Sequence, residues 1–210
     1  MAIAIDSTSS GSGSATWTFS HTTSGIDRYL FVFIITTGSI TSVTYNGVVM
    51  TLLQSLNALD YVYGLASPAI GTNTVSIITS IAAAANSVSY TGASGTQPVT
   101  IQTGGTGVAT TYTQAITTTK ANSWVIGFFM WNRSSDNLTA GTGSTLRVTT
   151  GGASTGVGRG LGIFDSNGTV TPGSYSMTVN GSAGSGAWDA IQFEMGIVVS
   201  GNASALLRFI

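Results

Sequence analysis

The chain has 210 residues, of which about two-fifths are Ser, Thr or Gly and only 6% are charged, with a net charge of −1. It has no basic run or stripe, so we expect neither nucleic acid nor an anionic membrane surface as a partner. The absence of cysteine excludes disulfides, Cys-ligated zinc and a thiol nucleophile, and the 42% of hydrophobic residues argue against disorder.

The chain begins with a short apolar segment followed by a Ser/Gly stretch. We interpret residues 1–14 as an N-terminal arm that carries Ile3 and Ile5 and ends in a flexible linker from Ser7 to Ser14. No basic leader or sustained apolar segment is present, so we expect no signal peptide. No stretch reaches the roughly 18 apolar residues of a membrane-spanning helix. These features predict a protein that is made in the cytoplasm.

Two segments are apolar on both faces, namely Tyr29–Ile35 and Trp124–Trp131. In a two-sheet sandwich only one face of each strand meets the core, so the other face needs a cover. Either long loops of the same chain cover these strands, or their second faces form a subunit interface.

The clearest local prediction is a hairpin at Asn46-Gly47. Both residues tolerate positive φ, which suits a two-residue type I′ turn. Counting outward from the turn predicts three cross-strand pairs with a mostly apolar face. These pairs are Tyr45 with Val48, Val43 with Met50, and Thr41 with Leu52.

Shorter alternating segments predict the remaining strands. The last one has apolar residues from Ile191 to Val199 on one face and Gln192 and Glu194 on a solvated face. Helix is expected for one turn at most, at Ser80–Ala85. We expect the Gly-rich tracts 92–107 and 141–160 to form long loops that act as contact surfaces. Further strands are expected near 15–19, 61–65, 73–79, 86–91, 108–118, 144–149, 157–164 and 175–179.

About a dozen strands with polar turns between them predict an all-β fold. We expect a two-sheet antiparallel β-sandwich of jelly-roll type with long Gly/Ser/Thr-rich loops, as a single domain over residues 15–205. The apolar C-terminal tail, residues 206–210, either adds to a sheet edge of its own chain or docks on a neighbour. Candidate interface residues in the arm and the tail are Ile3, Ile5, Leu206, Leu207, Phe209 and Ile210.

Catalytic constellations are hard to assemble from this sequence. His21 is the only histidine and is expected in a solvated loop, and the seven acidic residues are dispersed singly. Asp165–Gly168 resembles the start of a calcium-binding loop but lacks the acidic residues that would complete it, so we expect a turn. The sequence therefore predicts a protein that is not an enzyme and that has no catalytic residues, metal site or cofactor.

Three tryptophans, Trp17, Trp131 and Trp188, lie at the ends or boundaries of predicted strands. They either form an exposed stacking platform for a cell-surface glycan or cap the hydrophobic core. A carbohydrate-binding or receptor-binding module, such as an adhesin or a tail-fibre domain, is the function that the first of these alternatives implies.

Three stretches, Ile40–Leu53, Tyr61–Ile77 and Val88–Gly92, resemble a jelly-roll-like β-sandwich domain of phage virion structural proteins. The resemblance covers about residues 28–132 and carries over no functional residue. It implies a virion protein made in the host cytoplasm: a capsid decoration or cement protein, a minor capsid component, or a fibre domain. The implied partners are copies of the chain itself and other virion proteins.

Overall fold

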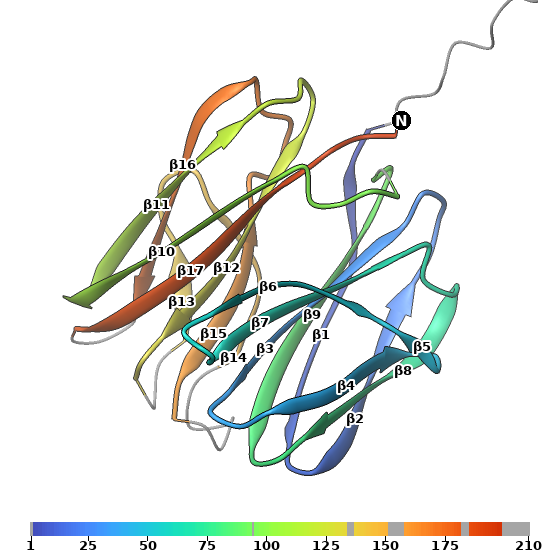
Figure 1. Ribbon diagram of the computed structural model, residues 1–210. Coiled ribbons are helices and arrows are strands. Elements are labelled where there is room, and N and C mark those ends of the chain that lie inside the picture. The colour runs from blue at the N-terminus through green and yellow to red at the C-terminus, as the bar shows by residue number, and fades with distance from the viewer. Residues whose placement is uncertain (1, 94, 134–136, 151–157, 182–184, 199–210) are drawn as a thin grey trace, which may run out of the picture.

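The computed structural model describes residues 2–93, 95–133, 137–150, 158–181 and 185–198 (Figure 1). The regular structure of these residues is entirely β, and each ladder between them is antiparallel, so the expected antiparallel all-β fold is confirmed. The strands are β1 Ala4–Gly13, β2 Thr16–Thr23, β3 Tyr29–Thr36, β4 Ile40–Tyr45, β5 Val48–Val49, β6 Thr51–Leu56, β7 Asp60–Ala66, β8 Gly71–Thr79, β9 Ala83–Thr91, β10 Thr100–Ala109, β11 Thr111–Thr118, β12 Trp124–Trp131, β13 Leu138–Ala140, β14 Thr145–Thr150, β15 Gly160–Asp165, β16 Gly173–Gly181 and β17 Gly186–Met195.

These strands form four sheets, where the sequence predicts two. The N-terminal half contributes the N-outer sheet, in the order β2-β8-β4-β5, and the N-inner sheet, β1-β9-β3-β7-β6. The C-terminal half contributes the C-inner sheet, β10-β17-β12-β15-β14, and the C-outer sheet, β11-β16-β13. The two inner sheets pack face to face, so the molecule is a four-layer stack (Figure 1). Its three hydrophobic cores are the N-core, the central core and the C-core.

The four-layer stack explains the two segments that are apolar on both faces. In β3, Phe31 enters the central core while Leu30 enters the N-core. In β12, Phe128 enters the central core and Phe129 the C-core. The rings of Phe31 and Phe128 meet with centroids 5.7 Å apart. Both expected covers are therefore wrong, because sheets of the same chain, and not loops or a second subunit, bury each face.

The two halves repeat one topology strand by strand. The order β1-β9-β3-β7-β6 matches β10-β17-β12-β15-β14, and β2-β8-β4 matches β11-β16-β13, with each strand in the same place along the chain. The apolar strands β3 and β12 are thus equivalent positions of two structural repeats. Equivalent sheets face each other in the central core, as two identical surfaces do in a symmetric dimer.

Most of residues 1–14 is a strand and not an arm with a linker. Residues 4–13 form β1, which pairs with β9 from Ala4↔Thr91 to Gly13↔Ala83. Both glycines of this segment are needed for packing, because a Cβ would lie 2.9 Å from the Cβ of Phe19 at Gly11 and 2.5 Å from the Cβ of Trp17 at Gly13. The Ser/Gly composition therefore serves close packing against β2 at the edge of the N-inner sheet.

The predicted hairpin forms as far as its second pair. Asn46 and Gly47 have φ of 49° and 77°, and Tyr45 pairs with Val48. The Met50 amide donates to the Val43 carbonyl at 2.9 Å. The third expected pair, Thr41 with Leu52, is wrong, because the chain leaves the N-outer sheet at this point. Thr51 begins β6 and pairs with Gly64 in the N-inner sheet.

More backbone is paired than the composition suggests. The Gly-rich tracts contain β10 and β14, and the expected helical turn at Ser80–Ala85 runs instead into β9. The expected solvated face of β17 is wrong, since Gln192 and Glu194 are fully buried.

Among the described residues we find no helix that is both long and apolar enough to cross a membrane.

Candidate functional site

The only histidine lies inside the fold. The ring nitrogens of His21 in β2 are 2.9 Å from Ser87 Oγ and 3.0 Å from Ser89 Oγ in β9. Asp6 accepts a hydrogen bond from Ser89 at 2.9 Å. In a catalytic triad the carboxylate accepts from the histidine, so this cluster does not have the hydrogen bonds of a triad. Burial lowers the pKa of His21 to about 4, although the charge of Asp6 opposes the shift. The expected solvated loop histidine is thus wrong, and His21 joins the N-outer sheet to the N-inner sheet.

The buried carboxylate of Asp165, at the turn that resembled a calcium loop, is ion-paired within its own half and hydrogen-bonded to the other half. Asp165 accepts hydrogen bonds from Arg147 Nε at 2.6 Å and Nη2 at 2.7 Å. The Tyr90 hydroxyl, from the N-inner sheet, donates to the same carboxylate at 2.8 Å. The Asp165 side chain is fully buried and that of Arg147 is 14% exposed. In the described part of the chain no group of three or more His, Cys, Asp or Glu could hold a metal ion.

Glu194 joins the β11–β12 connection to β17. Its carboxylate accepts hydrogen bonds from the backbone amides of Thr119 at 2.9 and 3.0 Å and of Lys120 at 2.7 Å. Burial opposes ionisation of this group, but the hydrogen bonds from the two amides and from the Thr119 and Ser123 side chains together outweigh it and lower the pKa of Glu194. The carboxylate is therefore a structural acceptor with no free side toward solvent.

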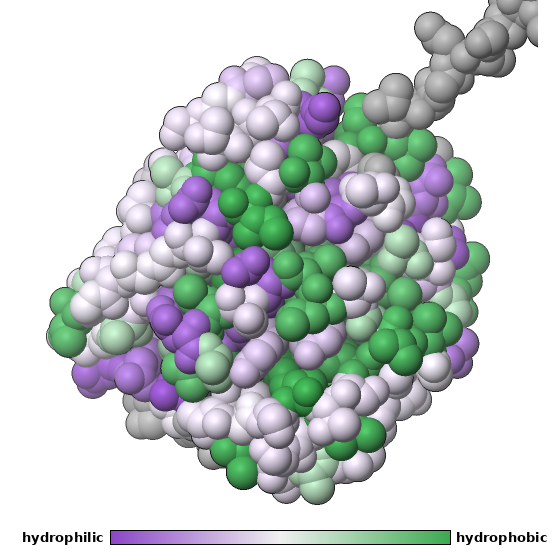
Figure 2. Space-filling view, viewed as in Figure 1, coloured by the Kyte–Doolittle hydropathy of each residue, from purple (hydrophilic) through white to green (hydrophobic). Residues whose placement is uncertain are grey.

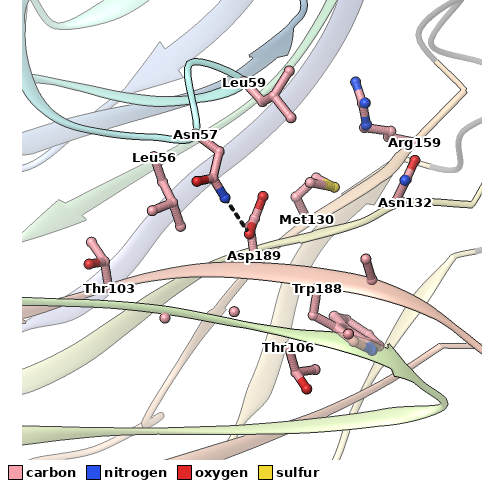
Figure 3. Close-up of a pocket in the computed structure, with 14 residues that line it drawn as sticks. Leu56, Asn57, Leu59, Thr103, Thr106, Met130, Asn132, Arg159, Trp188 and Asp189 are labelled. Atoms are coloured by element: carbon pink, nitrogen blue, oxygen red, sulfur yellow. Dashed lines mark hydrogen bonds between the residues drawn. The ribbon is translucent and has the colours of Figure 1, made fainter.

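A cleft of about 580 Å³ opens where the two halves meet (Figure 3). The turn between β6 and β7 forms one wall, with Leu56, Asn57 and Leu59. Strands β10, β12 and β17 of the C-inner sheet form the other. Asn57 Nδ2 donates to Asp189 Oδ1 at 2.8 Å across this boundary. The cleft is thus a feature of the stacked halves and belongs to neither half alone.

A pair of carboxyl groups lies beside the cleft. Asp60, the first residue of β7, is 1% exposed. Burial raises its pKa well above the ordinary value, the charge of Asp189 and a hydrogen bond to it act in the same direction, and the charge of Arg159 opposes the shift. Neither carboxyl oxygen of Asp60 finds a donor, so the protonated form, which can itself donate to the Asp189 carboxylate, is favoured. Two carboxyls in direct hydrogen-bond contact are too close to flank a glycosidic bond, and Asp60 does not line the cleft.

The three tryptophans do not form one exposed platform. Trp131 and Trp188 stack in the C-core with ring centroids 5.2 Å apart and an angle of 14° between their planes. They are 0% and 1% exposed, and Trp17 in the N-core is 8% exposed. The indoles therefore cap hydrophobic cores, although Trp188 also borders the cleft.

The candidate interface residues of the arm are also internal. Ile3 is buried in the central core, and the partly buried Ile5 packs against the same core. The tail candidates lie outside the described residues, namely Leu206, Leu207, Phe209 and Ile210.

The outward surfaces of the two outer sheets carry hydroxyl groups and no charge. We call them the N-outer face and the C-outer face. None of the strands in these sheets, all of whose residues the structure describes, contains Asp, Glu, Lys or Arg. The side chains of β2 and β8 that point outward are Thr16, Thr18, Ser20, Thr22, Thr72, Thr74, Ser76 and Ile78.

Cross-strand hydroxyl pairs occur on the equivalent strand pairs of the two faces, β2–β8 and β11–β16. Thr22 Oγ1 lies 2.8 Å from Thr72 Oγ1 on the N-outer face, and Thr113 Oγ1 lies 2.9 Å from Thr178 Oγ1 on the C-outer face. The β4–β5 hairpin adds the exposed Val48 and Val49 at the rim of the N-outer sheet. In the view of Figure 2, weakly polar residues dominate the surface and apolar groups are scattered among them.

No family model, curated protein or solved structure matches the chain.

Proposed function

We propose that the chain is a non-enzymatic structural protein of a virion, of the capsid decoration, cement or minor capsid type. It binds further copies of itself through the N-outer face and the C-outer face. The observation that carries this proposal is the pair of uncharged, hydroxyl-rich faces at opposite ends of the four-layer stack (Figure 1).

Desolvation favours contact through such faces. Burying a hydroxyl group that finds a new hydrogen-bond partner costs far less than burying a charge, and interface centres are depleted in charged residues. A row of Thr and Ser on one copy can pair with a row on another. The net charge of −1 leaves little repulsion between copies.

The size of the faces sets the strength of the contact. Three strands of about eight residues give a face of roughly 27 by 15 Å, or roughly 400 Å². A stable interface buries about 800 Å² on each partner, so one face gives a weak and reversible contact. Two faces on each copy add avidity in an array. This arrangement suits a protein that assembles on a repetitive surface.

Charged substitutions on the faces test this proposal. Thr18→Lys on the N-outer face and Ala115→Lys on the C-outer face alter exposed side chains, and Gln102→Lys on the edge strand β10 is the matched control. We expect light scattering to show concentration-dependent association of the wild type and of Gln102→Lys, and a monomer for the double variant Thr18→Lys/Ala115→Lys. Association of the double variant equal to that of the wild type would overturn the proposal.

A second candidate function is a carbohydrate-binding or receptor-binding module. The observation that favours it is the polar cleft between the halves, not the buried tryptophans.

A further inference from the structure

A tight turn of the backbone forms one wall of the cleft between the halves. Asn57 and Ala58 have φ of 53° and 52°, which makes a tight turn between β6 and β7. The Leu59 amide closes this turn on the Leu56 carbonyl at 3.0 Å. The turn places the Asn57 amide group against Asp189. The polar groups of the cleft are therefore fixed before any ligand enters.

A glycine on β10 packs directly against Asp189. Gly105 is the cross-strand neighbour of Asp189. A Cβ at Gly105 would lie 2.7 Å from the Trp188 carbonyl oxygen and 2.8 Å from Asp189 Oδ1. A residue with a side chain would therefore clash at this point. The absence of a side chain lets the β10 backbone lie directly against Asp189, whose side chain stays partly exposed in the cleft.

The lining combines directional polar groups with apolar surface. Asn57 and Asp189 lie near the centre, and Asn132 and Arg159 lie at the opposite end of the cleft from Thr103 (Figure 3). Apolar lining comes from Leu56, Leu59 and Met130. Asp189 keeps acceptor capacity beyond its bonds to Asn57 and Asp60, since an ionised carboxylate accepts about four hydrogen bonds.

This combination selects one class of ligand over others. A carboxylate at the centre disfavours anions such as phosphates and nucleotides. The acidic residues here do not form a metal-binding group among the described residues. A ligand with several neutral hydroxyl groups and an apolar C–H face satisfies both kinds of lining, because amide and carboxylate groups pair with hydroxyls while the aliphatic side chains cover C–H groups.

We propose that the cleft between the halves is a binding site for a neutral saccharide. The Asp189 carboxylate and the Asn57 amide bind sugar hydroxyls beside the bare backbone of Gly105. Leu56 and Leu59 contact the C–H face of the ring. This site is separate from the N-outer and C-outer faces.

Saturation-transfer NMR on the full chain tests the site, with the methyl pyranosides of glucose, galactose, mannose and N-acetylglucosamine as probes. We expect transfer to at least one neutral probe and at least tenfold weaker binding of glucuronate, which the carboxylate repels. Asn57→Gly removes the amide and suits the positive φ, and it should weaken binding at least tenfold. Its matched control is Asn46→Gly, which makes the same change at φ of 49° on the distant hairpin and should bind as the wild type does.

A second variant guards against an indirect effect of the first. A Cβ at Gly107 meets no atom within 4 Å, so Gly107→Val adds bulk at the cleft without a clash. It should fold normally and lose binding, while Thr18→Lys/Ala115→Lys should keep it even where self-association is lost. The proposal is overturned if no neutral probe shows transfer, or if binding is the same in the wild type, Asn57→Gly and Gly107→Val.

Discussion

Several of the few charged and titratable side chains of this protein lie inside the fold, where each joins different elements. His21 connects the N-outer and N-inner sheets, and Asp165 and Asp60 connect the two halves. Glu194 holds the β11–β12 connection on β17. Buried polar groups that find partners make one arrangement of layers more favourable than others. The outer faces, by contrast, are left without charge.

Acid should weaken the fold through His21. Its pKa is about 4 in the folded protein and 6.5 when exposed, so below pH 6.5 the unfolded chain binds a proton that the folded chain excludes. The stability present above pH 6.5 is therefore lost as the pH falls to 4, by about 3 kcal/mol. Urea unfolding at pH 4, 5, 6 and 7 measures this loss. In His21→Gln the free energy of unfolding should fall clearly less between pH 7 and pH 4. An equal fall in the variant and the wild type would contradict this role of His21.

Asp60 should have the opposite pH dependence. Its pKa is raised in the folded protein, so its contribution to stability is present at acidic pH and is lost as the pH rises through the folded pKa. Asp60→Asn keeps a donor toward Asp189 without the ionisable group. We expect urea unfolding to show it about 1–2 kcal/mol more stable than the wild type at pH 8 and equal to it at pH 4.

The matched substitution at the other carboxyl that joins the halves should act in the reverse direction. Asp165→Asn leaves Arg147 without its buried counter-charge, and we expect a loss of about 3–5 kcal/mol at pH 7. If the two Asn variants have the same effect at neutral pH, the distinction between the carboxyl pair and the ion pair is wrong.

At the scale of elements, the strands in which apolar and polar residues alternate could be predicted from sequence. The strands whose two faces have the same polarity could not. The hairpin at Asn46-Gly47 and strand β16 follow from turn chemistry and period-2 alternation. Strand β1 has Ser and Gly on both faces, and β10 lies in a Gly-rich tract, so neither shows a hydrophobic period. Their strand structure comes from tertiary pairing, which outweighs local propensity.

Removal of residues 1–13 distinguishes a strand from an arm. Strand β1 covers β9 along its whole length, and Ile3 fills the central core. Deletion should expose the edge of a sheet and lower stability by several kcal/mol, with aggregation as the visible result. Circular dichroism melting and size-exclusion chromatography measure both effects. A truncated chain that stays soluble and melts at the wild-type temperature would show that β1 is dispensable.

At the scale of the whole molecule, the four-layer stack could not be read from the sequence because the partner of each inner sheet is its equivalent in the other half. Tyr29–Ile35 and Trp124–Trp131 signalled that both faces were buried, and their repetition was the signal for two structural repeats. The cleft was missed for the same reason. Asp60 and Asp189 are far apart in sequence, and nothing in their spacing indicates that the halves bring them together.

The shared central core should make the two halves unfold together. Phe128 lies within 5.2 to 5.7 Å of the rings of Phe31, Phe33 and Phe193 from both inner sheets. Phe128→Ala should cost about 3–5 kcal/mol and keep a single calorimetric transition. Residues 1–93 expressed alone would expose the central face of β3 and should aggregate. Two separate transitions, or a soluble folded fragment, would show that the halves are independent.

The most direct test of the proposed function is sedimentation velocity on the two single-face variants, Thr18→Lys and Ala115→Lys, alone and mixed. If both faces bind further copies, the wild type forms assemblies of more than two copies, and their size increases with protein concentration. Each variant keeps one active face, so neither variant nor their mixture should exceed two copies. Growth of both variants to the size of the wild type, or a wild type that stays monomeric at every concentration, would contradict assembly through the outer faces.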